Sequence, residues 1–117
     1  VFIGGTTGES HSLSLEERLR LTGRWCDIVR NTPLKVVVHV GANCLTDSCK
    51  LASHAEKLGV VAISALSPSY FKPTSVSLLV ECTAKIALAA PTLPFYFYDI
   101  PSMTGVSLSM PEYLEQA

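Results

Sequence analysis

The stretch Lys35-Val36-Val37-Val38-His39-Val40, which ends at Gly41, decides the fold class. Its apolar residues are continuous and β-branched, whereas a strand with one solvent-exposed face alternates apolar and polar residues. A continuous run of this kind is typical of a parallel strand that is buried on both faces. The stretch therefore predicts a parallel sheet.

Similar runs recur before and after this stretch, and helical patterns separate them. The predicted strands cover residues 1–3, 35–40, 60–65 and 95–98. The predicted helices cover residues 15–29, about 46–58, about 75–90, and a last one from Ser109 onward. The order β-α-β-α-β-α-β-α implies parallel strands joined by helical crossovers.

Capping signals place the helix ends. Residues 14–17 (Ser-Leu-Glu-Glu) have capping-box form, and residues 109–112 resemble a second one. Thr46 or Asp47 is predicted to cap the second helix, and Gly59 follows its end. The predicted buried residues of the first helix are Leu15, Leu19, Trp25 and Ile28.

Two architectures suit this pattern: a small doubly wound sheet, or part of a (β/α)₈ barrel, which needs roughly 250 residues in full. The chain of 117 residues begins inside a predicted strand and stops inside a predicted helix. We therefore expect an α/β fold that is a partial TIM barrel of about four βα units, with residues 1–117 as one domain truncated at both ends. Ligands bind at the carboxyl ends of the strands in either architecture.

Composition excludes several classes of function. A net charge of -1 gives no electrostatic footprint for nucleic acid or for an anionic membrane surface. The most apolar stretch, residues 76–94, is interrupted by Glu81, Lys85 and two prolines, so no membrane span is predicted. No secretory signal is visible either. These features predict a cytoplasmic globular protein.

The four cysteines form no C-x-x-C pair, which favours reduced structural thiols. Cys44, Cys49 and His54 recur at intervals of five, but zinc ligands are usually spaced more tightly and a fourth ligand is missing. The sequence therefore predicts no metal site and no cofactor.

The first predicted loop, residues 4–9, reads Gly-Gly-Thr-Thr-Gly-Glu. Glycine allows close approach of the backbone to a ligand, and the hydroxyls of Thr6 and Thr7 with nearby N–H groups suit a carboxylate or phosphate. The loop is neither a Walker A motif nor a G-x-G-x-x-G fingerprint, and a purely structural turn is the alternative interpretation.

Tyr98 closes the last predicted strand, where a phenol can exchange a proton with a bound substrate. Core packing is the alternative, since the residue lies in an aromatic run. Four motifs carry a resemblance to a known family, in residues 4–9, 39–42, 63–70 and 98–105.

In this order the motifs resemble the pyruvate-dependent Schiff-base aldolases of the dihydrodipicolinate synthase and N-acetylneuraminate lyase family, and most of all the animal-type lyases. The resemblance covers the whole chain as the second to fifth βα units of the barrel. It implies a class I aldolase that cleaves N-acetylneuraminate to N-acetylmannosamine and pyruvate without a cofactor. It also implies a homotetramer.

The resemblance assigns roles to four residues. Thr6 and Thr7 match the pair that holds the pyruvate carboxylate, and Tyr98 matches the tyrosine that shuttles a proton between the substrate hydroxyl and that carboxylate. Tyr70 matches an aromatic residue near the subunit interface that in some relatives reaches a neighbouring active site.

Met103 stands where dihydrodipicolinate synthases have an arginine that binds a second substrate carboxylate. A thioether cannot pair with a carboxylate, so this position favours the lyases. Asp99 replaces an Asn or His of many relatives, and the pair Val60-Val61 replaces an Ala-Asp-like pair.

The family's imine-forming lysine is expected on a sixth strand, which these residues do not include. The five lysines present are Lys35, Lys50, Lys57, Lys72 and Lys85. None follows a predicted strand at the expected position, so the isolated chain is expected to be inactive. The alternatives are an inactive truncated isoform that binds the full subunit, another pyruvate aldolase such as 4-hydroxy-2-oxoglutarate aldolase or dihydrodipicolinate synthase, and a small nucleotide-binding domain.

Overall fold

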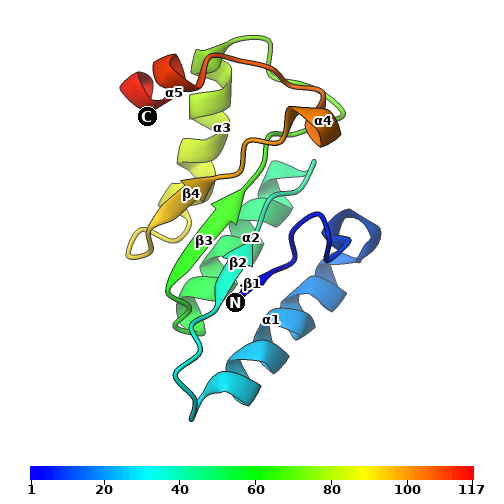
Figure 1. The fold of residues 1–117 in the computed structure, drawn as a ribbon, viewed down its shortest axis with the longest axis vertical. Coiled ribbons are helices and arrows are strands. Elements are labelled where there is room, and N and C mark those ends of the chain that lie inside the picture. The colour runs from blue at the N-terminus through cyan, green and yellow to red at the C-terminus, as the bar shows by residue number, and fades with distance from the viewer.

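The computed structural model describes residues 1–117 and contains one four-stranded sheet (Figure 1). All neighbouring strands pair in parallel, and their order in the sheet is their order in the chain. The strands are β1 (Phe2–Ile3), β2 (Val37–His39), β3 (Ala62–Ala65) and β4 (Phe95–Phe97). The prediction of four parallel strands is confirmed.

Three long helices connect successive strands, and shorter helices follow β1 and β4. The long helices are α1 (Leu15–Val29), α2 (Leu45–Lys57) and α3 (Val76–Leu88). The shorter ones are the 3-10 helix η1 (Ser10–Ser12), α4 (Pro101–Thr104) and α5 (Met110–Gln116). None of these helices is both long and apolar enough to cross a membrane.

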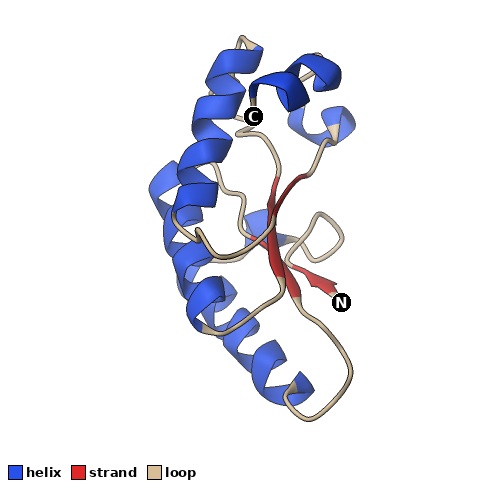
Figure 2. Cartoon of the chain, turned by 90° about the vertical axis from the view of Figure 1, so that its left-hand side faces the viewer, coloured by secondary structure: helices blue, strands red, loops and turns tan.

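The long helices lie along one face of the sheet and leave the other face uncovered (Figure 2). Consecutive strand order explains this, because right-handed crossovers that advance in one direction all pass over the same face. A doubly wound sheet reverses direction and carries helices on both faces. The chain therefore has the arrangement of a partial (β/α)₈ barrel, and the doubly wound alternative is wrong.

The core fills the space between the sheet and these helices. Alternate side chains of each strand point into it, and the small side chains of α2 allow that helix to pack closely on the sheet. Thirteen buried apolar residues form the main cluster: Ile3, Val29, Val36, Val38, Val40, Leu51, Ala52, Ala55, Val60, Ile63, Ala65, Ile86 and Ala90.

The uncovered face presents aromatic side chains. Phe95 and Phe97 pack into the helix layer, so the alternation of β4 places Tyr96 and Tyr98 on the uncovered face. Tyr96 is 60% exposed there, and Phe2 on β1 is 48% exposed. In a closed barrel this face would be the inner surface.

Helix α1 begins at the predicted capping box. The Ser14 hydroxyl accepts a hydrogen bond from Glu17 N–H at 3.2 Å, and the Ser14 N–H donates to Glu17 Oε2 at 2.8 Å. Ser75 and Ser109 cap α3 and α5 in the same way through their hydroxyls. These local signals locate three helix starts.

Helix α2 begins earlier than predicted. Its N-cap is Cys44 rather than Thr46 or Asp47, and Leu45 is its first residue. Leu45 packs against the main core, and this burial extends the helix toward its amino end despite the better capping residues downstream. Gly59 follows the helix with φ of 74°, as predicted.

Two further predictions were wrong. Ile28 is 56% exposed, and the buried positions of α1 are Arg18, Thr22 and Val29. Residues 99–105 were predicted as a loop, but they contain α4, which starts at Pro101 and is followed by Gly105 with φ of 67°. Proline at a first helical position and glycine after the last one explain the short helix.

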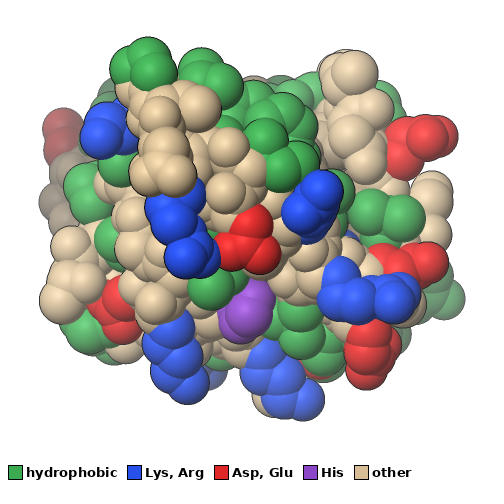
Figure 3. Space-filling model, turned by 90° about the horizontal axis from the view of Figure 1, so that it is seen from below, with side chains coloured by type: hydrophobic (Ala, Val, Ile, Leu, Met, Phe, Trp, Pro, Cys, Tyr) green, Lys and Arg blue, Asp and Glu red, His purple; other side chains and the backbone are tan.

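The end of the molecule that holds the amino ends of the strands carries charges of both signs among apolar side chains (Figure 3). Arg30 and Asp27 form an exposed ion pair at 2.7 Å, which contributes little to stability. The two cavities described next include the loops at the other ends of the strands.

Candidate functional site

Thr6, Thr7 and Tyr98 are among the residues that line one cavity of about 450 Å³, which lies along β1 and the turn after it. The threonines come from the turn after β1, and Tyr98 comes from the residue directly after β4. The other lining residues are Val1, Phe2, Ile3, Gly4, Gly5, Gly8, Leu21 and Trp25. The structure thus brings together three of the four residues predicted for the site, across the two outer strands.

A tight turn presents the two threonines. Gly4 has φ of 68°, a conformation that favours glycine, and Glu9 N–H donates to Thr6 O at 3.0 Å. Glu9 itself has φ of 51° and is the one non-glycine residue with a positive φ. Thr6 is half-buried and Thr7 is exposed, so both are accessible from the cavity.

Tyr98 is held by its backbone and by its ring. Its N–H donates to Ala65 O at 2.8 Å, which extends the pairing of β3 with β4. Its ring is nearly perpendicular to the rings of Phe2 and His39, with both centroid distances at 6.0 Å. These edge-to-face contacts fix the ring beside the cavity.

His39, at the end of β2, was not predicted as a site residue. Its side chain is 1% exposed, and its Nε2 accepts a hydrogen bond from Leu66 N–H at 3.2 Å. Its Nδ1 lies near the backbone of Gly4 but has no well-formed hydrogen bond. Burial, together with the charges of Arg18 and His11, lowers the pKa of His39 to about 3. The imidazole is therefore neutral, with its proton on Nδ1.

The side chain of Arg18, on α1, binds backbone carbonyl groups at the end of β2. Its Nη1 donates to Gly41 O and its Nη2 donates to His39 O, both at 2.9 Å. Burial lowers the pKa of the guanidinium, and Asp47 opposes that shift. The guanidinium thus fixes the turn that follows β2.

Replacing Arg18 by methionine should lower the free energy of unfolding by about 2–5 kcal/mol. The change leaves the carbonyl oxygens of His39 and Gly41 buried without their donor, while the methionine retains most of the packed volume. Urea denaturation measures the loss, and Arg20→Met on the exposed side of the same helix is the control. Equal destabilisation by both substitutions would contradict the assignment.

Stability should also fall as the pH is lowered from about 6.5 toward 3. Unfolded His39 takes up a proton near pH 6.5, whereas folded His39 does so only near 3. In that interval the unfolded state binds more protons, so acid favours unfolding, and the full contribution is present above 6.5. Urea midpoints over this range measure it. His39→Gln should lack this component, and an unchanged acid dependence in that variant contradicts the prediction.

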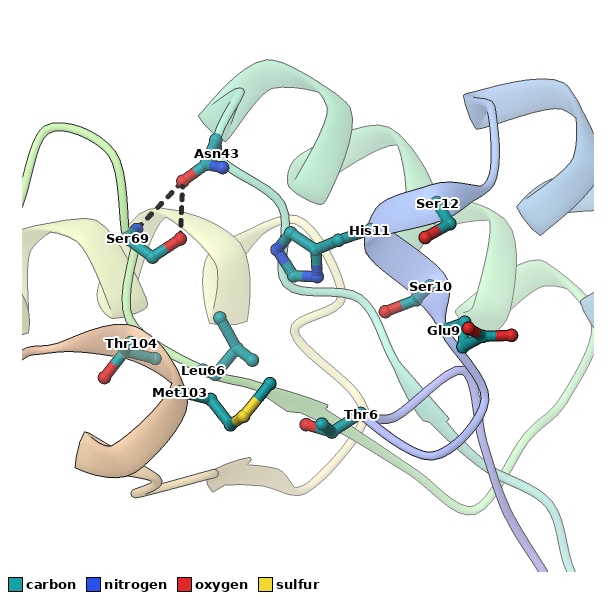
Figure 4. A pocket seen from close by; sticks show the side chains of 10 residues that line it. All are labelled: Thr6, Glu9, Ser10, His11, Ser12, Asn43, Leu66, Ser69, Met103 and Thr104. Carbon is teal, nitrogen blue, oxygen red and sulfur yellow. Dashed lines mark hydrogen bonds between the residues drawn. The ribbon is translucent and has the colours of Figure 1, made fainter.

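A second cavity of about 520 Å³ adjoins the first, and Thr6 lines both. Ten residues line it, of which two, Leu66 and Met103, are apolar (Figure 4). Met103 from α4 and Thr6 face each other across it (Figure 4). Burial and the charge of Arg18 lower the pKa of His11, which enters it from η1. No arginine or lysine lines this cavity.

Asn43 ties two of the loops together at the rim of this cavity. Its Oδ1 accepts from Ser69 N–H at 2.8 Å and from the Ser69 hydroxyl at 3.3 Å (Figure 4). It also accepts from Tyr70 N–H at 3.1 Å. The loop after β3 is therefore held against the loop after β2.

Tyr70 is not brought into either cavity. It is 77% exposed and stacks edge-to-face on Phe71, with ring centroids 5.0 Å apart. Asp99 is also exposed. All four cysteines are free, and no group of three or more His, Cys, Asp or Glu side chains is placed to hold a metal ion.

Sequence reasoning missed His39 and Arg18, although each left a signal. Arg18 occupies the stripe at positions 15, 18, 22, 25 and 29 of α1, whose spacing marks the buried face of a helix. His39 is the one polar residue in an otherwise apolar strand core. A polar group at a position that the pattern buries is a candidate for a structural or functional role.

Comparisons with known proteins agree with this geometry. Residues 1–115 match the dihydrodipicolinate synthetase family. The chain is 47% identical over 114 residues to N-acetylneuraminate lyase B of Xenopus laevis, covering 97% of this chain and 43% of that protein. It is 44% identical over 115 residues to N-acetylneuraminate lyase of Gallus gallus, covering 98% of this chain and 37% of that protein.

Among solved structures, the N-acetylneuraminate lyase (sialic acid aldolase) of Aliivibrio salmonicida aligns with a TM-score of 0.92 at 44% identity. The alignment covers 98% of this chain and 38% of that one. The chain thus spans about two fifths of the length of these relatives. The family match extends over nearly every residue and includes the turn with Thr6 and Thr7 as well as Tyr98, and the chain therefore belongs to the dihydrodipicolinate synthetase family.

Proposed function

We propose that residues 1–117 are the second to fifth βα units of a class I aldolase that cleaves N-acetylneuraminate to N-acetylmannosamine and pyruvate. The observation that carries the proposal is the shared cavity of Thr6, Thr7 and Tyr98, in a chain whose relatives at 42–47% identity are named N-acetylneuraminate lyases. We refer below to the longer protein that carries these residues as the full-length protein.

Thr6 and Thr7 hold the pyruvate carboxylate in this proposal. The turn after β1 offers two hydroxyl groups and backbone N–H groups beside the cavity, and hydrogen bonds to a charged acceptor are stronger than neutral ones. The anchored carboxylate fixes the carbonyl carbon of pyruvate relative to Tyr98.

Tyr98 carries the proton. As the carbon–carbon bond breaks, the phenol takes the proton of the substrate hydroxyl that becomes the aldehyde oxygen of N-acetylmannosamine, and passes its own proton to the pyruvate carboxylate held by Thr6 and Thr7. In the reverse direction it returns that proton to the new hydroxyl. The ring contacts with Phe2 and His39 keep the phenol at the edge of the sheet where the substrate lies.

The imine-forming lysine lies outside these residues in this proposal. No lysine lines the cavity that holds Thr6, Thr7 and Tyr98. Lys50 and Lys57 are on α2, Lys85 is on α3, and Lys72 is an exposed residue of the loop after β3. The other half of the barrel would supply the amine that attacks pyruvate.

One experiment tests the assignment and the location of the lysine. The full-length protein should release pyruvate from N-acetylneuraminate, and borohydride should trap a pyruvate adduct on a lysine that follows residue 117. The isolated 117-residue chain should trap none. Trapped pyruvate on the isolated chain would overturn the location of the lysine, and an active protein that prefers 4-hydroxy-2-oxoglutarate would overturn the choice of substrate.

Met103 supports the lyase over the synthase, because its cavity has no arginine or lysine for a second carboxylate. Met103→Arg in the full-length protein should lower kcat/KM for N-acetylneuraminate by about tenfold, since the unpaired guanidinium faces a ligand without a matching anion. The same change should improve the condensation of pyruvate with aspartate semialdehyde. Steady-state assays with both substrates measure this, and Ser102→Arg, on the same short helix, is the control. Improvement with neither substrate contradicts the role of Met103.

We propose in addition that the full-length protein is a cytoplasmic homotetramer and that Tyr70 lies at a subunit interface. The exposed pair of Tyr70 and Phe71 is apolar surface of the kind that subunit contacts bury. The free cysteines fit a reducing compartment. Sedimentation equilibrium of the full-length protein and of its Tyr70→Ala variant tests the tetramer and the interface.

A further inference from the structure

We infer that His39 is a positioning residue for Tyr98, acting through the peptide unit that joins Ala65 to Leu66. The inference rests on the proposed role of Tyr98, and it assigns His39 no contact with the substrate. Its basis is a continuous path of hydrogen bonds across three strand ends.

The peptide between Ala65 and Leu66 is bonded on both of its sides. Its carbonyl oxygen accepts from Tyr98 N–H at 2.8 Å, and its N–H donates to His39 Nε2 at 3.2 Å. A displacement of the imidazole therefore moves the acceptor that fixes the backbone of Tyr98. Serial bonds of this kind polarise and strengthen one another in a buried setting.

The imidazole replaces a backbone acceptor. In a regular parallel ladder, the Leu66 N–H would donate to Val40 O, because Val40 N–H already donates to Ser64 O at 2.7 Å. The side chain of His39 takes that place instead. The chain after β2 is thereby released to turn, and the ring is held on the uncovered face beside Tyr98.

The rest of the site fixes His39 from the other directions. Its carbonyl oxygen accepts from the Arg18 guanidinium at 2.9 Å. Phe2, Tyr98 and His39 contact one another edge-to-face, with interplanar angles of 84–88°. Histidine suits the position because it combines an aromatic edge for Tyr98 with an acceptor for Leu66.

Gly41 leaves the space that this arrangement needs. A Cβ at Gly41 would lie 2.9 Å from His39 Nε2 and 3.0 Å from Leu66 N. Gly41 does not have a positive φ, so alanine there causes a clash without backbone strain. Gly41→Ala therefore displaces the His39 side chain without replacing any of the three aromatic residues Phe2, His39 and Tyr98.

The first test needs no catalytic activity. Amide hydrogen exchange of the full-length protein should show that His39→Phe and Gly41→Ala each speed exchange of the Tyr98 N–H by about tenfold or more. The Ile63 N–H, which donates to Pro94 O at 3.0 Å at the other end of the same strand pair, is the internal reference. His54→Gln is the matched control, since His54 bonds Leu19 O in the helix layer. Unchanged Tyr98 exchange in both variants would overturn the inference.

The second test separates positioning from general destabilisation. His39→Phe should lower kcat for N-acetylneuraminate by about 10- to 100-fold with KM changed far less, and His39→Gln, which keeps an acceptor for Leu66 N–H, should recover part of the loss. In a Tyr98→Phe background, His39→Phe should have little further effect. An equal loss in both backgrounds, or no loss at all, would overturn the inference. An inactive parent with altered Tyr98 exchange would count against the proposed function alone.

Discussion

Replacement of Tyr98 by phenylalanine in the full-length protein should lower kcat for N-acetylneuraminate cleavage by about 100- to 10,000-fold. The change removes the phenol oxygen that accepts the substrate proton and keeps the ring that packs against Phe2 and His39 at 6.0 Å. KM and the thermal midpoint should change little, because the ring contacts and the bond from the backbone N–H to Ala65 O do not involve the hydroxyl. Steady-state kinetics and thermal denaturation provide both measurements.

Tyr96→Phe is the matched control for this substitution. Tyr96 lies in β4, two residues before Tyr98 and on the same face of the sheet, and does not line the cavity. Removing the Tyr96 hydroxyl should leave kcat within about twofold of that of the unsubstituted protein. If the two variants lose activity equally, Tyr98 has no special part in proton transfer.

Replacement of both Thr6 and Thr7 by valine should raise the KM for pyruvate in the synthetic direction by about 100-fold. Valine keeps the shape of threonine and removes two hydroxyl donors from the turn beside the cavity. The fold should persist, because the bond from Glu9 N–H to Thr6 O uses only backbone atoms. The initial rate of N-acetylneuraminate synthesis at varied pyruvate concentration gives the KM.

The pair of serine substitutions, Thr6→Ser and Thr7→Ser, keeps the hydroxyls and should restore most of the pyruvate affinity. Thr74→Val changes an exposed threonine outside both cavities and serves as the negative control. Unaltered pyruvate kinetics in the double valine variant would show that the carboxylate binds elsewhere.

The fold could be predicted from the sequence because its signals are local. The valines of β2 indicate burial on both faces, and Ser14 with Glu17 marks the start of α1 within four residues. The start of α2 could not be predicted in this way, since Leu45 is helical because of its contact with a core that the rest of the chain builds. The prediction that Ile28 is buried was wrong for the same reason. Several faces of the helix fit the apolar spacing, and packing against the sheet determines which of them is buried.

Some residues of the site could likewise be predicted from the sequence, and others could not. Thr6, Thr7 and Tyr98 stand at strand ends, and the barrel rule that places ligands there leads to them directly. Their roles remain predictions. The roles of His39 and Arg18 could not be read from the sequence, because they depend on bonds to distant backbone groups. His39 Nε2 accepts from Leu66 N–H, and Arg18 donates to the carbonyl oxygens of His39 and Gly41, so each bond joins residues 21 to 27 positions apart.

The consecutive order of the strands has a consequence for how long each part of the site persists. Each βα unit pairs only with the unit before it and the unit after it, so the sheet resembles a short linear array in which opening begins at an unpaired edge and moves inward. Native-state exchange should therefore be slowest in β2 and β3 and fastest in β1 and β4. The carboxylate anchor and the proton carrier belong to those outer strands, so the lifetime of the assembled site depends on whatever pairs with β1 and β4.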